Sequence, residues 1–156
     1  MTFTKFAVAA LFSTSAFAQL PMSRVLTMEA AQAIAQEAMA KCRADGYKVT
    51  VLVVDGLNAP KAMLRDDGAS ASTTEAAKMK ATATMLYNRP SGPAQPRPAG
   101  TTAPPATIPG TINAQGGVPI KVDNVTIGAV AVSGGSGEAD AACANAGIAK
   151  AAAKLK

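Results

Sequence analysis

The stretch that decides the fold begins at Gly116, ends at Gly135 and reads GGVPIKVDNVTIGAVAVSGG. Gly116–Val122 and Val125–Val132 are apolar, β-branched runs, as expected of strands. The two residues between them, Asp123-Asn124, form a tight turn. Because Pro119 has no N–H to donate, its strand is expected at a sheet edge. The stretch therefore predicts an antiparallel hairpin.

A second hairpin is predicted upstream of the first. Lys48–Val54 (KVTVLVV) is nearly all apolar, which favours a strand buried on both faces. Turn residues occupy Asp55–Pro60, and Ala62–Arg65 supplies the returning strand. The predicted order is helix, hairpin, helix, long loop, hairpin and a final helix from about Glu138 to Lys154.

The first two helices are predicted from caps and apolar spacing. Thr27 is the expected N-cap of the first helix and Asp45-Gly46 its end; its apolar stripe comprises Met28, Ala31, Ile34, Ala35, Ala38 and Cys42. Ser72 and Glu75 are expected to form a capping box, and Arg89-Pro90 to end the second helix. The buried stripe of that helix is expected to comprise Ala76, Met79, Ala83 and Leu86.

The first 18 residues have the pattern of a secretory signal peptide. A lysine at position 5 precedes an apolar run, and Ala16-Phe17-Ala18 fits the cleavage rule. The alternative is a membrane anchor, but the apolar run is shorter than the roughly 20 residues a spanning helix needs. We expect cleavage after Ala18, a periplasmic or secreted protein without a membrane span, and a single domain over residues 19–156.

Composition excludes several classes of function. The chain of 156 residues contains no histidine, which removes most triad and metal-hydrolase chemistry. Its formal net charge of +5 comes from scattered basic residues, so no nucleic-acid partner is expected. Neither catalytic nor metal-ligating residues are assigned. Cys42 and Cys143 could form a disulfide in an exported protein or remain separate buried thiols.

A proline-rich segment covers about residues 90–110. Seven of the ten prolines lie there, among Gly, Ala and Thr without an apolar period. Such composition is typical of a long extended loop. The loop is either a spacer or, alternatively, a lid or partner-binding arm.

Several blocks together resemble the GlcG/HbpS-type haem-binding family. They are VVD (Val53–Asp55), RDDGA (Arg65–Ala69), Lys80 nine residues before RPS (Arg89–Ser91), GGVPI (Gly116–Ile120), GAVAVSGG (Gly128–Gly135) and EADAACANAGI (Glu138–Ile148). The resemblance implies a profilin-like α/β (α+β) domain with about five antiparallel strands, the outer helices packed on one face, and assembly into homo-oligomers. A fifth strand is expected near Thr111–Ala114. If the first and last helices are antiparallel neighbours, Cys42 approaches Cys143.

The same resemblance directs attention to residues that could hold haem. Gly134-Gly135 before a helix could cradle an anion such as a haem propionate, or could simply turn the chain. Lys80 and Arg89 are candidate anion partners, or solvated surface charges. Gly117 belongs to the GGVPI block. Without histidine, the iron ligands left are Met, Tyr and Cys, among which Met63, Met79, Met85 and Tyr87 are candidates or core filler.

The sequence thus predicts an exported haem-binding protein that captures, stores or transfers haem, or a similar anionic cofactor, without catalysis. One alternative is an oligomeric structural or interaction module without a cofactor. Another is a haem-degrading enzyme, as the common name of the family implies. In Arg65-Asp66-Asp67, a loop ion pair is favoured over a cation site, since calcium gathers six to eight oxygens.

Overall fold

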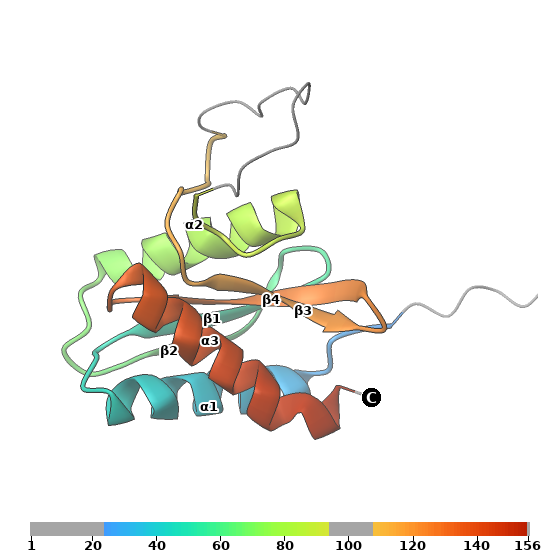
Figure 1. Ribbon diagram of the computed structural model, residues 1–156, viewed down its shortest axis with the longest axis horizontal. Helices are drawn as coiled ribbons and strands as arrows, with labels where there is room; N and C mark the ends of the chain where they lie inside the picture. Colours follow the sequence, from blue (N-terminus) through green and yellow to red (C-terminus); the bar gives the residue numbers. More distant parts are fainter. Residues whose placement is uncertain (1–23, 94–107, 156) are drawn as a thin grey trace, which may run out of the picture.

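The computed structural model describes residues 24–93 and 108–155. Its elements are α1 (Met28–Ala44), β1 (Thr50–Asp55), β2 (Pro60–Arg65), α2 (Ser72–Tyr87), β3 (Gly117–Val122), β4 (Val125–Ser133), α3 (Gly137–Ala151) and the short 3-10 helix η1 (Ala152–Lys154). The strands form an antiparallel sheet in the order β2-β1-β4-β3 (Figure 1). Both hairpins and the α+β class are confirmed. The predicted signal peptide and most of the proline-rich loop lie outside the described residues.

The fifth strand expected at Thr111–Ala114 is wrong, since the described part of the chain has four strands and this segment is irregular. The polar groups of this segment form hydrogen bonds outside the sheet. The Thr111 N–H and hydroxyl both donate to the Ile108 carbonyl, at 3.0 and 2.6 Å. The Ala114 carbonyl accepts from Ser91 Oγ at 2.7 Å. The segment therefore closes on itself and on the loop after α2.

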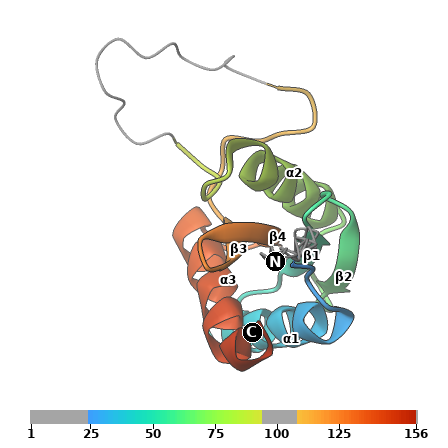
Figure 2. The same cartoon turned by 90° about the vertical axis from the view of Figure 1, so that its right-hand side faces the viewer.

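Three layers build the domain, with α2 on one face of the sheet and α1 and α3 on the other (Figure 2). The side chains of β1 and β4 alternate between the two faces. Val51, Val53, Val130 and Val132 pack in the cluster with α1 and α3, and Leu52, Val54, Ala129 and Ala131 pack with α2. The strand predicted at Lys48–Val54 is therefore buried on both faces, as expected. None of the described helices is long and apolar enough to cross a membrane.

The predicted features of α1 are largely confirmed. Thr27 Oγ1 accepts a hydrogen bond from the Ala30 N–H at 3.1 Å, as an N-cap should. The apolar stripe is buried except for Met28, which is 51% exposed in the first turn.

The predicted capping box of α2 is wrong. Ala71 occupies the N-cap position without a side-chain bond, and Glu75 pairs instead with Lys78 at 2.8 Å. The buried face is also rotated relative to the predicted stripe. It comprises Ala77, Lys80, Ala81, Ala83 and Thr84, whereas Leu86 is 52% exposed. An apolar pattern could not find this face because a lysine lies in it.

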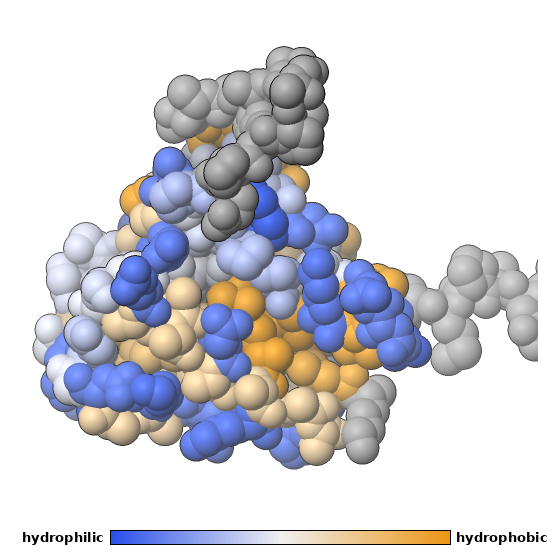
Figure 3. Space-filling view, viewed as in Figure 1, coloured by the Kyte–Doolittle hydropathy of each residue, from blue (hydrophilic) through white to orange (hydrophobic). Residues whose placement is uncertain are grey.

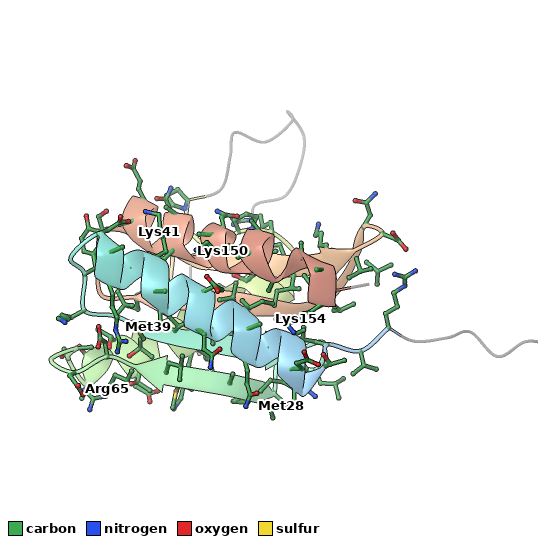
Figure 4. The ribbon with its side chains drawn as sticks, turned by 90° about the horizontal axis from the view of Figure 1, so that it is seen from below. Met28, Met39, Lys41, Arg65, Lys150 and Lys154 are labelled. Atoms are coloured by element: carbon green, nitrogen blue, oxygen red, sulfur yellow. A yellow bond between two sulfur atoms is a disulfide. The ribbon has the colours of Figure 1, made fainter. Side chains whose placement is uncertain are left out.

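A disulfide between Cys42 and Cys143 joins α1 to α3, with the Cα atoms 5.5 Å apart, within the range of ordinary disulfides. The two helices lie side by side and antiparallel (Figure 4). Gly147 permits this close approach, because a Cβ there would lie 2.6 Å from the Ile34 carbonyl oxygen. Lys150 and Lys154 pair with Glu37 and Glu29 across the outer surface.

A buried ion pair joins α2 to α3 across the end of the sheet. Lys80 Nζ lies 2.7 Å from Asp140 Oδ2, and both side chains are at most 5% exposed. Nζ also donates to the Val132 carbonyl of β4 at 2.9 Å. The second oxygen of Asp140 accepts from the Gly135 N–H at 2.9 Å. Both charges are thus removed from water with further hydrogen bonds, which is the condition for tolerating a buried pair.

In the RDDG loop, Asp66 forms an ion pair with Arg43 of α1, whereas the Arg65 guanidinium donates to the Ala69 carbonyl. Arg43 Nη2 lies 2.8 Å from Oδ1 of the buried Asp66 carboxylate, and Lys48 Nζ is 3.8 Å from Oδ2. The hydrogen bond from Arg43 lowers the pKa of Asp66 below its ordinary value. This contact ties the loop after β2 to the end of α1.

Removal of the disulfide should destabilise the fold. The bridge closes a loop between residues 101 positions apart, so it restricts the unfolded chain strongly. We expect Cys42→Ala/Cys143→Ala to lower the free energy of unfolding by about 2–4 kcal/mol. Urea denaturation of both proteins measures this, with the wild type under reductant as a second comparison. An unchanged midpoint would contradict the prediction.

Substitution of Lys80 alone should lower the free energy of unfolding more than removal of both charges of the pair. Lys80→Met leaves the Asp140 carboxylate buried without its cation, at a cost of about 3–5 kcal/mol. Lys80→Met/Asp140→Asn removes both charges and keeps an acceptor for the Gly135 N–H, so it should be the more stable of the two variants. Denaturation of these proteins together with the Asp140→Asn single variant completes the cycle and gives the coupling free energy. If the double variant is the less stable, the two groups do not act as a pair.

Acidification should reveal the contribution of Asp66. Because its pKa is lower in the folded than in the unfolded state, its stabilisation is present at neutral pH and is lost as pH falls through the folded-state pKa. The difference in unfolding free energy between wild type and Asp66→Asn should shrink as pH falls below about 5. Denaturation curves from neutral to acidic pH measure it; a constant difference would show that the charge of Asp66 is not responsible.

Candidate functional site

A surface pocket of about 510 Å³ lies where the loop after α2, the start of β3 and the first half of α3 meet. This volume is within the range of about 300–1,000 Å³ found for small-molecule sites. The pocket is lined by Arg89, Pro90, Ser91, Pro93, Gln115, Gly116, Gly117, Glu138, Ala141, Ala142 and Asn145. The face that carries α3 combines apolar and hydrophilic surface (Figure 3).

One face of α3 forms a wall of the pocket. Glu138, Ala141, Ala142 and Asn145 recur at intervals of three and four residues, so they share one side of the helix. The adjacent side, which includes Cys143, is buried against α1 and the sheet. Small alanine side chains on the pocket side leave a flat surface to which a planar molecule can lie close.

The loop after α2 forms the opposite wall and is fixed by Ser91. Its N–H donates to the Gly117 carbonyl at 2.9 Å, and its hydroxyl accepts from the Gly117 N–H at 2.8 Å. The same hydroxyl donates to the Ala114 carbonyl. Ser91 is therefore a positioning residue that connects the loop to the start of β3.

Arg89 supplies the positive charge of the pocket. Its guanidinium lies over the Tyr87 ring, 5.3 Å from the centroid, and Nη1 donates to the carbonyls of Pro90 and Gly92 at 3.0 and 3.3 Å. These contacts hold the planar group in one place. Within residues 24–93 and 108–155, neither Arg89 nor the pocket residue Glu138 forms an ion pair.

Lys80 lies behind this pocket and does not line it. Its ammonium is bonded to Asp140 and to the Val132 carbonyl, so it is neither a free partner for a bound anion nor a solvated surface charge, the two alternatives that the sequence left open. Gly116, which lines the pocket, separates the pair from the opening: a Cβ there would lie 2.8 Å from Lys80 Nζ. The pair therefore supports the pocket from beneath.

The glycines predicted to bind a cofactor have packing roles. A Cβ at Gly117 would lie 2.3 Å from Thr84 Oγ1 of α2, so glycine is needed for close approach, although the residue also lines the pocket. Gly134 has φ +142°, and a Cβ there would meet the Lys48 carbonyl at 2.4 Å. The Gly135 N–H donates to Asp140. The predicted anion cradle is thus occupied by the chain's own carboxylate.

Met63 lies away from the other candidates. It is half-exposed on β2, the edge of the sheet opposite β3, and pairs across the sheet with Leu52. The structure therefore brings Arg89 and Gly117 together in one pocket, with Lys80 behind it, and leaves Met63 outside. Among the described residues, no group of three or more His, Cys, Asp or Glu side chains could hold a metal ion.

The sequence reasoning missed Gln115, Asn145 and the roles of Ser91 and Glu138. Gln115 lies against both Gly92 and Gly137, and thereby connects the two walls of the pocket. The pairing of Ser91 with Gly117 spans 26 positions in the chain. A second small-residue stripe on α3, beside its buried one, was the available signal for this wall.

The fold and sequence match known proteins. The HbpS-like family, described as "Haem degrading protein HbpS-like", matches residues 26–149. The structure resembles a double mutant of HbpS from Streptomyces reticuli, with 28% identity, a TM-score of 0.70, and coverage of 90% of this chain and 97% of that chain. It also resembles the Klebsiella pneumoniae protein ORFY, with 25% identity, a TM-score of 0.76, and coverage of 89% and 99%.

A more distant similarity is to a PduOC:heme complex, with 21% identity, a TM-score of 0.68, and coverage of 81% of this chain and 94% of that chain. At this identity the likeness concerns the fold alone. No curated protein matches the chain. The match over residues 26–149, with the similar structures, shows that the chain belongs to the HbpS-like family of haem-degrading proteins.

Proposed function

We propose that this protein binds haem in the pocket between the loop after α2 and α3, and acts in its capture, storage or transfer. The observation that carries the proposal is the pocket itself, which places a fixed guanidinium opposite a flat alanine face. The description of the family makes haem the expected ligand. A similar planar, anionic cofactor has the same chemistry.

The residues of the pocket fit the organic part of haem. Arg89 offers several N–H donors in a plane, which suits the carboxylate of a propionate. Ala141 and Ala142 offer apolar surface to the macrocycle. The iron has no such partner, because the pocket lining in the described residues contains no Met, Cys or Tyr and the whole chain has no His.

Binding is proposed over turnover for this reason. Breakdown of haem requires iron to be held and reduced, and the pocket offers no ligand for it. The second candidate function is haem degradation, which the family description favours. A third, an interaction module without a cofactor, would use self-association and the proline-rich loop.

Export and self-association are part of the proposal. The disulfide supports an oxidising compartment, such as the periplasm or the cell exterior, where such bonds persist. Cleavage is proposed after Ala18. Homo-oligomer formation is supported by β2, an edge strand on which Met63 and Leu64 are 50% and 36% exposed.

Hemin titration tests haem binding. The wild type should shift the Soret band and saturate near one haem per subunit or per dimer. Arg89→Gln removes the proposed propionate contact and should weaken binding about tenfold, whereas Lys121→Gln, an equal loss of charge at an exposed site on β3, should leave it unchanged. No saturable Soret shift in the wild type would refute the proposal.

The same complexes separate binding from degradation. Ascorbate is added as the reductant. If the protein only binds haem, its Soret band should last as long as that of a haem complex with a protein that does not degrade haem. Loss of the band with release of iron, dependent on the protein, would favour the enzyme instead.

A further inference from the structure

The sequence limits which side chains could ever bind haem iron. Proteins use His, Cys thiolate, Met or Tyr as axial ligands. This chain has no His, two Cys, seven Met and two Tyr. Both cysteines are in the disulfide, so neither offers a thiolate.

The remaining candidates that the structure describes lie away from the pocket lining, while Met1 and Met22 fall outside the described residues. Met39 is buried in the core with α1, and Tyr47 packs against the same core. Met85 packs between α2 and the sheet, while Met28 and Met63 are exposed elsewhere. Met79 is half-buried on α2. Among the residues described, no Met, Tyr or Cys lines the pocket.

Residues 94–107, whose sequence is AQPRPAGTTAPPAT, contain none of the four ligand types. Tyr87 is the candidate nearest to the pocket in the chain, and its ring stacks under the Arg89 guanidinium. Its place in the structure is therefore explained by support of Arg89, and not by a position in the lining.

What the pocket does offer is independent of any metal. Arg89 is oriented by the carbonyls of Pro90 and Gly92, and its guanidinium suits a carboxylate. Ala141 and Ala142 form an apolar wall on α3 that suits the face of a macrocycle. Both features recognise parts of the ligand that haem shares with iron-free porphyrin.

We propose, building on the haem-binding function above, that this site selects porphyrin carboxylic acids by their acid group and flat face, without a protein bond to the metal. Its ligand class therefore includes metal-free porphyrins as well as haem. Glu138 adds a constraint, because its carboxylate lines the same pocket. One acid group of the ligand pairs with Arg89, and the other points away from Glu138 toward solvent.

Titration of the full chain with hemin, protoporphyrin IX and protoporphyrin IX dimethyl ester tests this proposal. Quenching of porphyrin fluorescence and the Soret band report binding. Hemin and protoporphyrin IX should bind within about threefold of each other, and the ester about tenfold more weakly than the free acid. Arg89→Gln should weaken both acids equally and leave the ester unchanged.

Charge variants provide the matched comparison. Glu138→Gln should tighten binding of both acids by a similar factor, since it removes a like charge from the pocket. Lys121→Gln, outside the pocket, should change none of the affinities. Circular dichroism of each variant establishes that the fold is retained.

The outcomes separate this inference from the function on which it rests. Hemin bound more than about tenfold tighter than protoporphyrin IX would mean that the protein ligates the iron, and would overturn the inference while haem binding stands. Equal affinity of acid and ester would also overturn it. If neither hemin nor protoporphyrin IX binds, the haem-binding function itself fails.

Discussion

The buried ion pair between Lys80 and Asp140 connects α2, α3 and the end of β4 behind the pocket. Lys80 comes from α2 and Asp140 from the first turn of α3, and the ammonium also binds the Val132 carbonyl of β4. A lysine and an aspartate removed from water are costly unless each is paired. The start of α3 therefore has to remain next to α2 and the end of β4, which fixes where the pocket walls stand.

Small residues make this arrangement possible in a chain with few aromatic side chains. Gly147 lets α3 approach the backbone of α1, and Gly117 lets β3 approach α2. Small side chains bury less apolar area per residue, but they also allow the backbones to lie close together. Close approach in turn gives the packing density that a core of Ala and Val requires.

Local sequence patterns were sufficient to predict the helices and hairpins. They do not reveal contacts between residues far apart in the chain. The β3–β4 hairpin and the Thr27 cap were predicted because their signals lie within a few residues. The prediction of the buried face of α2 was wrong because the charge of the buried Lys80 is neutralised by a partner 60 positions away. The pocket depends on three distant segments, so its candidate list contained Arg89 and Gly117 but also Met63, at the opposite edge of the sheet.

The pocket face of α3 is fixed by one contact just before it in the sequence and one just after it. Asp140 is bonded to Lys80, and Cys143, three positions later, is bonded to Cys42 of α1. Ala141 and Ala142 lie between these two attachments and point into the pocket lining. Helix positions within one turn move together, so two fixed points allow α3 little rotation.

A wall that cannot rotate suits a rigid, flat ligand, because little ordering of the protein is then required on binding. The contacts outside the pocket thus give two alanines and one arginine the fixed positions that the proposed binding mode requires.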